Sequence, residues 1–218
     1  MKRRCISMAI LIGAASLTLL GQVPAGFGFK GGISLANMSY RITPIDYELE
    51  TKPLIGPVAT IFVEAFKGRH FSFQFDAGYV VKGCRYTTES VTVNHLDNDR
   101  ITINEGAEST SRFSYITLVP MARYRFDLER MSPYFLLGPR IDFQLRYDTD
   151  SPYPLDLEYG TQLGLTIGAG LEYRLNDLGI FTEVQYLPDL SPVSNKEPLL
   201  INHNMLSLTL GIRWIVSE

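Results

Sequence analysis

The feature that most constrains the fold is a long alternation between Glu158 and Leu175, which reads EYGTQLGLTIGAGLEYRL. Counted in twos from Tyr159, one set of residues is apolar and ends on Tyr173, while the other set is glycine or polar. A period of two over this length indicates a β-strand, because successive side chains point to opposite faces. Soluble sheets commonly use strands of roughly five or six residues, whereas a strand of about ten or more tilted residues suits a membrane.

Seven further segments repeat this pattern. The eight predicted strands cover 27–40, 54–66, 71–82, 114–126, 133–147, 158–175, 179–187 and 204–216. Long polar segments (41–52, 83–112, 148–156 and 188–202) alternate with short turns (67–70, 127–132 and 176–177). Such an alternation is typical of outer-membrane barrels, which have short periplasmic turns and long external loops. The sequence therefore predicts an all-β fold, an eight-stranded antiparallel up-and-down transmembrane β-barrel in the cell outer membrane.

The longest polar segment contains two brief alternations of its own, Ser90–Val93 and Arg100–Asn104. Because ordinary connections have about four to six residues, a segment this long is functional or disordered. We expect the two alternations to form a hairpin beyond the membrane.

The first 25 residues read as a signal peptide, which leaves 26–218 as the barrel domain. Three cations, Lys2, Arg3 and Arg4, precede the apolar run Met8–Leu20, and small residues at the usual cleavage spacing end at Ala25. About thirteen apolar residues cannot cross a hydrocarbon core that needs about 20. Removing these cations lowers the net charge from −3 to about −6, which disfavours a nucleic-acid partner.

The polar faces of the strands carry charges of both signs. We expect a lumen charge network made of Asp76, Arg123, Arg125, Arg140, Asp142, Glu172, Glu183 and Arg213. The same faces also hold Glu64, Lys82, Arg146 and Arg174. Eight strands enclose an interior just wide enough for side chains, and charges there must pair or hydrate. The pattern thus favours a salt-bridged plug over an open pore, although the arginines could instead steer an anion.

A soluble lipocalin-like calyx is the alternative fold, since it also alternates along eight strands but turns its apolar face inward to bind an apolar ligand. Two observations favour the membrane barrel. The glycines on the polar face of 158–175 suit a crowded interior, and aromatic residues gather toward strand ends as in interface belts.

Several motifs resemble the PorT-like outer-membrane β-barrel family of Gram-negative bacteria, a porin-like family with an outer membrane protein beta-barrel domain. They are FKGGISLANM at 29–38, FDAGYVVKG at 75–83, Pro120 before RYRF at 123–126, PY at 133–134 with GPR at 138–140, GAGLEY at 168–173, and LTLGIRW at 208–214. The resemblance covers essentially the whole mature chain. It implies an eight-stranded barrel, and the namesake of the family is tied to a protein-secretion system. Expected partners are therefore outer-membrane lipid and envelope or secretion-system proteins.

One acidic group in the long loop could bind a hard cation such as calcium. His95, Asp97 and Asp99 supply alternating ligands, but no glycine stands at the turn position that such loops need. A solvated acidic loop is the simpler interpretation, and we expect no metal and no cofactor.

The same loop holds possible catalytic parts, namely Ser90, Ser109 and Ser111 with His95. Catalysis requires a nucleophile within hydrogen-bond reach of its base, and nothing in the sequence fixes that geometry. Cys84 is the one cysteine left after signal removal, most simply a small buried or rim residue and otherwise a candidate for an intermolecular bridge. We therefore predict a non-enzymatic barrel whose external loops bind a partner or envelope component, with a small-solute channel or a membrane enzyme as alternatives.

Overall fold

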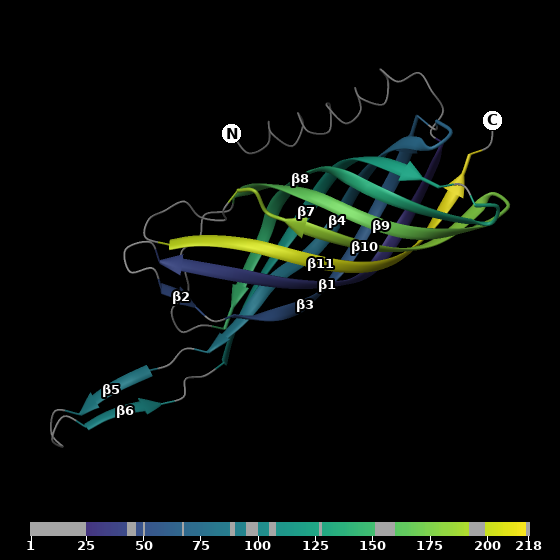
Figure 1. Ribbon diagram of the computed structural model, residues 1–218. Coiled ribbons are helices and arrows are strands. Elements are labelled where there is room, and N and C mark those ends of the chain that lie inside the picture. The colour runs from purple at the N-terminus through teal and green to yellow at the C-terminus, as the bar shows by residue number, and fades with distance from the viewer. Residues whose placement is uncertain are drawn as a thin grey trace.

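The fold is a single closed ring of strands (Figure 1). The computed structural model describes residues 25–42, 47–49, 51–66, 68–87, 90–94, 100–104, 108–126, 128–150, 160–191 and 199–216. The ring consists of β1 (Gly26–Ile42), β3 (Thr51–Ala65), β4 (Phe71–Thr87), β7 (Glu108–Arg125), β8 (Met131–Thr149), β9 (Thr161–Leu175), β10 (Leu178–Pro188) and β11 (Leu199–Ile215). Each strand pairs antiparallel with the next, and β11 pairs back onto β1. The predicted eight-stranded up-and-down barrel is confirmed. Apart from Ala25, the predicted signal peptide lies outside the described residues.

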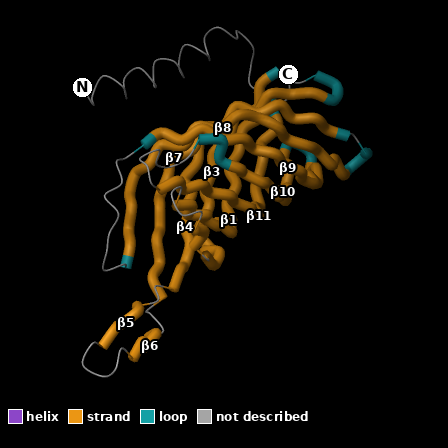
Figure 2. Tube along the Cα trace, turned by 60° about the vertical axis from the view of Figure 1, so that its left-hand side comes forward, coloured by secondary structure: helices purple, strands orange, loops and turns teal. Residues whose placement is uncertain are grey.

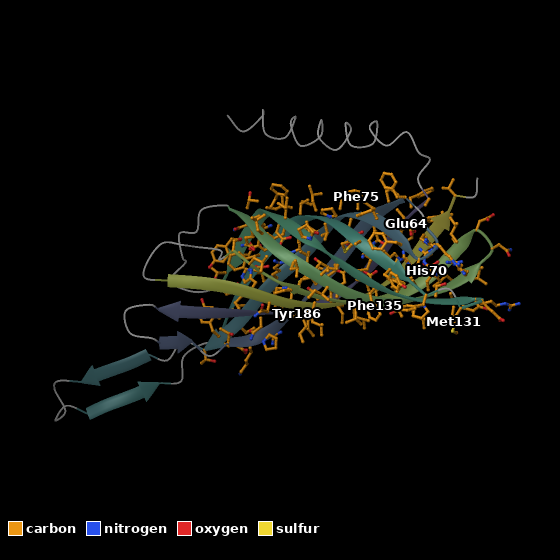
Figure 3. The ribbon with its side chains drawn as sticks, turned by 45° about the horizontal axis from the view of Figure 1, so that its top comes forward. Glu64, His70, Phe75, Met131, Phe135 and Tyr186 are labelled. Carbon is orange, nitrogen blue, oxygen red and sulfur yellow. The ribbon has the colours of Figure 1, made fainter. Side chains whose placement is uncertain are left out.

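Apolar side chains cover the outside of the barrel. Figure 3 shows Phe75, Phe135 and Tyr186 around the outer surface, where they are 45%, 58% and 45% exposed. The intervening residues point inward, so polar and charged side chains fill the lumen. The soluble calyx is therefore wrong, because its apolar face would line the interior. Among the described residues, no helix is long and apolar enough to cross a membrane.

Exposed aromatic rings concentrate at the barrel end that carries the short turns. Phe27 stacks on Trp214 with ring centroids 5.7 Å apart, and Phe126 makes edge contacts with Tyr124 and Phe135. Aromatic rings of this kind occupy the membrane–water interface in outer-membrane barrels. We identify this end as the periplasmic end and the other as the loop end.

Two inward glycines of β9 make room for large lumen side chains. A Cβ on Gly170 would stand 2.3 Å from the ring of Tyr134, and one on Gly164 would stand 2.5 Å from the guanidinium of Arg140. These contacts explain the glycine-rich face from which the strand was predicted. Tyr159, the expected first tyrosine of that strand, lies outside the described residues.

Short turns join strands at the periplasmic end as expected. Asn176 and Asp177 connect β9 to β10, where Leu175 pairs with Leu178. Asn176 adopts a φ of 54°, a left-handed conformation that suits a two-residue hairpin turn and that asparagine tolerates better than most residues.

At the loop end several strands run further than the sequence predicted, although β9 begins at Thr161 and not at 158. The segment 41–52 is not all loop, because β1 continues to Ile42 and β2 (Tyr47–Leu49) pairs with it. Likewise β4 and β7 stay paired up to Thr87 and Glu108, and β11 begins at Leu199 inside the expected loop 188–202. The cause is that ladder hydrogen bonds continue after the strands leave the membrane, where no apolar alternation marks them.

The predicted hairpin within the long loop is confirmed. Strand β5 (Ser90–Asn94) pairs antiparallel with β6 (Arg100–Asn104). Figures 1 and 2 place the hairpin well beyond the loop end of the barrel, in line with β4 and β7.

One predicted alternation in the fifth strand is wrong at its loop end. Ser114 pairs with Arg146 but Tyr115 pairs with Gln144, so Leu145 is an extra residue that forms a bulge. A bulge reverses which face the following residues occupy. The side chain of Arg146 is therefore outside and 72% exposed, while Tyr147, expected outside, stacks on the buried ring of Phe113.

Two exposed leucines test which surface lies in lipid. Leu208 on β11 is 49% exposed and Leu190, just after β10, is 70% exposed. We expect Leu208→Arg to reduce the free energy of unfolding by about 2–4 kcal/mol, because its charge would enter the hydrocarbon region. The measurement is urea unfolding of the barrel in lipid vesicles.

Leu190→Arg is the matched control and should change stability by less than about 0.5 kcal/mol, as exposed substitutions usually do. Equal effects of the two substitutions would contradict the assignment of Leu208 to the lipid-facing band.

Candidate functional site

The lumen next to the periplasmic end holds two carboxylates enclosed by arginines. Arg213 on β11 bridges Glu64 of β3 and Glu172 of β9. Arg123 Nη2 lies 2.6 Å from Glu172 Oε2, and Arg125 Nη2 lies 2.8 Å from Glu64 Oε1. Both carboxylates are fully buried, so each depends on the guanidinium groups around it.

The middle of the lumen is organised by a lysine. Lys30 of β1 forms ion pairs with Glu183 of β10 and with Asp76 of β4, the latter at 2.7 Å. Tyr134 donates its hydroxyl hydrogen to Glu183 Oε2 at 3.0 Å, and Gln74 donates to Asp76 Oδ1 at 2.8 Å. Four strands thus meet through one set of hydrogen-bonded charges.

A third charged layer lies toward the loop end. Lys82 Nζ is 2.7 Å from Asp142 Oδ2 and 3.0 Å from Asp189 Oδ1, and Arg140 pairs with the same two carboxylates. His203 Nδ1 lies 3.4 Å from Asp189 Oδ2, within ion-pair range if the imidazole is protonated. Asp189, which follows β10, therefore pairs with cations from two strands and lies next to the imidazole of a third.

An apolar layer covers these charges at the loop end. It consists of Ala36, Met38, Val80, Cys84, Phe113, Tyr115, Leu187 and Met205, all buried. Cys84 is fully buried within it, one of the two positions that the sequence allowed. Its burial disfavours the intermolecular disulfide that the sequence left open.

The buried charges balance one another in the described part of the lumen. Six cationic side chains (Lys30, Lys82, Arg123, Arg125, Arg140 and Arg213) meet six carboxylates (Glu64, Asp76, Asp142, Glu172, Glu183 and Asp189). An isolated charge in such surroundings would cost several kcal/mol, and pairing offsets that cost. The buried part of the lumen that the structure describes is therefore neutral and offers no excess of positive charge to draw in an anion.

All eight residues of the predicted charge network point into the lumen, and the structure brings them into contact with one another or with shared partners. Sequence reasoning missed Lys30, Asp189 and His203. Lys30 stands in a strand of weak alternation, and Asp189 follows a strand end. Counting back in twos from Arg213 reaches His203, so the alternation of the last strand could have placed His203 in the lumen. It was missed because the expected strand began only at 204.

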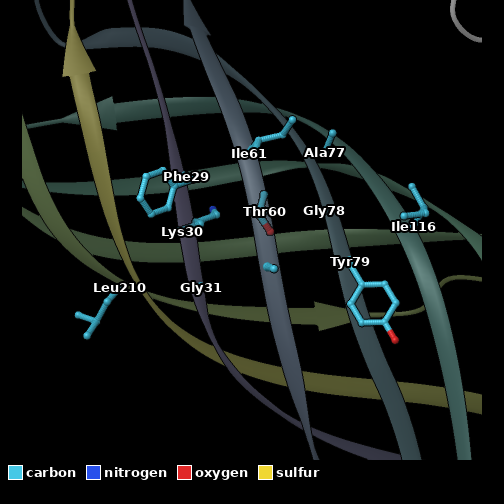
Figure 4. Close-up of a pocket in the computed structure, with 11 residues that line it drawn as sticks. Phe29, Lys30, Gly31, Thr60, Ile61, Ala77, Gly78, Tyr79, Ile116 and Leu210 are labelled. Carbon is cyan, nitrogen blue, oxygen red and sulfur yellow. The ribbon is translucent and has the colours of Figure 1, made fainter.

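A hollow of about 680 Å³ lies on the outer surface of β11, β1, β3, β4 and β7 (Figure 4). It exists because Gly31 and Ala59 are small, while Phe29, Ile61 and Tyr79 around it are exposed. Since this surface faces lipid, the hollow is not a passage through the lumen.

The described residues of the predicted catalytic set do not form a hydroxyl–histidine pair. His203 is enclosed by the rings of Phe113 and Tyr115, with centroids 5.3 and 6.2 Å away, and neither of its nitrogens hydrogen-bonds to a described residue. Ser111 instead lies 3.3 Å from the hydroxyl of Thr149. In the described part of the chain no three His, Cys, Asp or Glu side chains are placed to hold a metal. The candidates His95, Asp97 and Asp99 lie outside the described residues.

Comparisons with known proteins agree with this architecture. A family model described as outer membrane protein beta-barrel domain matches residues 21–195. No curated protein matches the chain.

Three solved structures are similar. Ail of Yersinia pestis is 16% identical, with a TM-score of 0.42 over 87% of this chain and 99% of that one. OprG of Pseudomonas aeruginosa is 11% identical, with a TM-score of 0.49 over 91% of this chain and 99% of that one. Neisserial surface protein A is 16% identical, with a TM-score of 0.47 over 89% of this chain and 100% of that one.

Removing one carboxylate tests the charge balance. We expect Glu64→Gln to lower the free energy of unfolding by about 3–5 kcal/mol, because Arg125 and Arg213 then lose a buried counter-charge. Urea unfolding in lipid vesicles measures the change.

Ser72→Ala is the control, since it removes a 2.6 Å hydrogen bond to Glu64 but no charge, and it should cost about 1 kcal/mol. The double variant Glu64→Gln with Arg125→Gln should recover part of the loss. A Glu64→Gln effect no larger than that of Ser72→Ala would rule out charge pairing as the main stabilising contribution of this carboxylate.

Proposed function

Because the chain belongs to the outer membrane protein beta-barrel domain family, we propose that it is a non-enzymatic outer-membrane barrel whose loop end binds a protein partner in the cell envelope. The barrel itself serves as a rigid membrane anchor, and the structure beyond its loop end forms the binding surface.

The observation that carries this proposal is the contrast between the filled lumen and the extended loop end. Inside, paired charges and an apolar layer occupy the space through which a solute would pass. Outside, β4 and β7 continue as a paired ladder to Thr87 and Glu108, and the β5–β6 hairpin follows (Figure 2). The β5–β6 hairpin and the ends of β4 and β7 thus form a projection that is not needed to close the barrel.

The hairpin also has a physical reason to bind. A two-stranded hairpin is at best marginally stable alone in water. Among the described residues β5 and β6 pair only with each other, so each keeps one edge with unpaired backbone groups. A partner strand added to such an edge would supply main-chain hydrogen bonds, a recurring mode of recognition.

The resemblance to the PorT-like family suggests the class of partner. Its motifs fall in strands of the barrel, including Phe75 to Gly83 in β4 and Leu208 to Trp214 in β11. On this basis the proposed partners are envelope or secretion-system proteins. The binding surface itself lies in the loop end, which those motifs do not cover.

A small-solute channel is the competing function, and conductance separates the two. We expect the barrel in planar bilayers to show no stable, ion-selective conductance steps, because the paired lumen charges block the path. A large-pore porin inserted under the same conditions is the positive control. Reproducible steps from the barrel would favour the channel instead.

Site-specific crosslinking in intact cells tests the binding surface. A photo-reactive residue replacing Glu108 at the loop end should yield a discrete adduct, because this position stands at the base of the projecting hairpin. The same residue at Arg69, exposed in a periplasmic turn, is the matched control and should not yield that adduct.

Deleting residues 90–104 should abolish the Glu108 adduct while the barrel keeps its heat-dependent migration on a gel. An adduct of equal yield from the deletion variant would show that the hairpin is not the binding element.

A further inference from the structure

Four exposed cations stand on the outer face of four neighbouring strands near the loop end. They are Lys52 on β3, Arg85 on β4, Arg112 on β7 and Arg146 on β8. Lys52 pairs directly with Arg85, so both lie on the same face of the sheet. We call these four residues the cation arc.

Because the strands are tilted, the four residues of the cation arc lie at nearly the same height along the barrel axis. Starting from Ala122, the cross-strand pairs can be followed round the ring in both directions until each path reaches β1. One path ends at Leu35, after Leu137, Ile167, Tyr186 and Leu206. The other path ends beside Gly26, after Phe73 and Ala65. The two end points on β1 are about ten residues apart, and this offset is the shear of the barrel. A horizontal line round the barrel therefore moves about one residue toward the periplasmic end at each strand.

The arc nearly follows such a line. Arg85 pairs with Thr110, and Arg112 is two residues nearer the periplasmic end than Thr110. Arg112 pairs with Asp148, and Arg146 is again two residues nearer that end. The cations consequently form a row round roughly half of the barrel, not a line along one strand.

The row lies at the boundary of the apolar band. Toward the periplasmic end the next large outward side chains are apolar and exposed: Ile55, Tyr79, Ile116, Phe143 and Leu145. The outward acidic residues Glu108, Asp148 and Asp150 lie on the other side of the row, toward the loop tips. The cations are therefore the first charges that outer-leaflet lipids meet above their acyl chains.

Electrostatics disfavours the pairing of Lys52 with Arg85 unless an anion is bound. Lys52 and Arg85 are like charges directly opposite each other, a pairing that destabilises a sheet. Among the described residues Lys52, Arg85 and Arg112 have no ion-pair partner, and Arg146 pairs with Asp148 at 2.8 Å. Every buried lumen cation, by contrast, is paired.

We propose that the cation arc binds the phosphate groups of outer-leaflet lipids. Guanidinium groups match phosphate oxygens in a bidentate geometry, and long basic side chains can reach from apolar surface to the headgroup level. A phosphorylated lipid fits both parts of the surface, since its acyl chains contact the apolar side chains directly below the arc. This interaction is separate from the protein partner proposed for the hairpin, because it uses the outer wall of the barrel.

The test measures binding of fluorescent lipid A, a bisphosphorylated glucosamine lipid, to the full barrel in detergent micelles. We expect the double substitution Arg85→Gln with Arg112→Gln to weaken binding about tenfold, as loss of two charge-assisted contacts would. The matched control, Arg69→Gln with Arg130→Gln, removes two exposed cations at the periplasmic end and should change binding less than about twofold.

Two further arms use the unmodified protein, so that the test does not depend on the variants folding. Dephosphorylated lipid A should bind about tenfold more weakly than lipid A, because the shared acyl chains then lack the phosphates. Inorganic phosphate at equal concentration should not displace lipid A. Equal losses in both double variants, equal binding of the dephosphorylated lipid, or displacement by free phosphate would each overturn the proposal.

Discussion

The structure depends on the pairing of β1 with β11, which closes the sheet from Gly26 and Ile215 at one end to Ile42 and Leu199 at the other. In hydrocarbon no water satisfies backbone N–H and C=O groups, so a sheet with a free edge would leave a row of them unpaired. Closure removes the edges and at the same time divides the side chains of every strand into an outer and an inner set. The apolar outer surface and the charged interior both follow from that division.

Closure with eight strands also makes the interior narrow, and the identity of the inner residues follows from this narrowness. Large inward side chains need small ones opposite, as Tyr134 needs Gly170. Charged side chains cannot reach bulk water and must find each other, so Arg213 bridges two carboxylates on different strands. The charge pairs join strands that are not neighbours, as when Lys30 of β1 meets Glu183 of β10. They therefore connect strands through the lumen, where backbone hydrogen bonds cannot act.

Most of this architecture could be predicted from the sequence because a period of two is a local signal that each membrane strand repeats. The lumen residues followed from the same parity, and Arg123, Arg140 and Glu172 point inward as expected. The predictions failed where the alternation of apolar and polar residues no longer indicates which face of the strand a residue occupies. The bulge at Leu145 moved Arg146 outside, since one extra residue reverses the faces beyond it. Asp189 belongs to the lumen charge network although it follows the end of β10. It could not be predicted, because its contacts with Lys82 and Arg140 depend on strands distant in sequence. The function of the loop end could not be predicted, because no pattern in that segment encodes a specific partner.

The two groups of charges on this barrel differ in a way that separates stability from interaction. Among the buried charges that the structure describes inside the barrel, cations and carboxylates are equal in number and pair with one another, so they stabilise the barrel. On the outer wall near the loop end, Lys52, Arg85 and Arg112 stand close together without an ion-pair partner among the described residues. Stability alone would favour neutral residues there, as at Asn37 of β1 and its cross-strand partner Asn204 of β11, which face outward on the two strands that follow β3 round the ring. These cations stand at the loop-end boundary of the apolar band, where the phosphate groups of the surrounding lipid would supply the missing counter-charge.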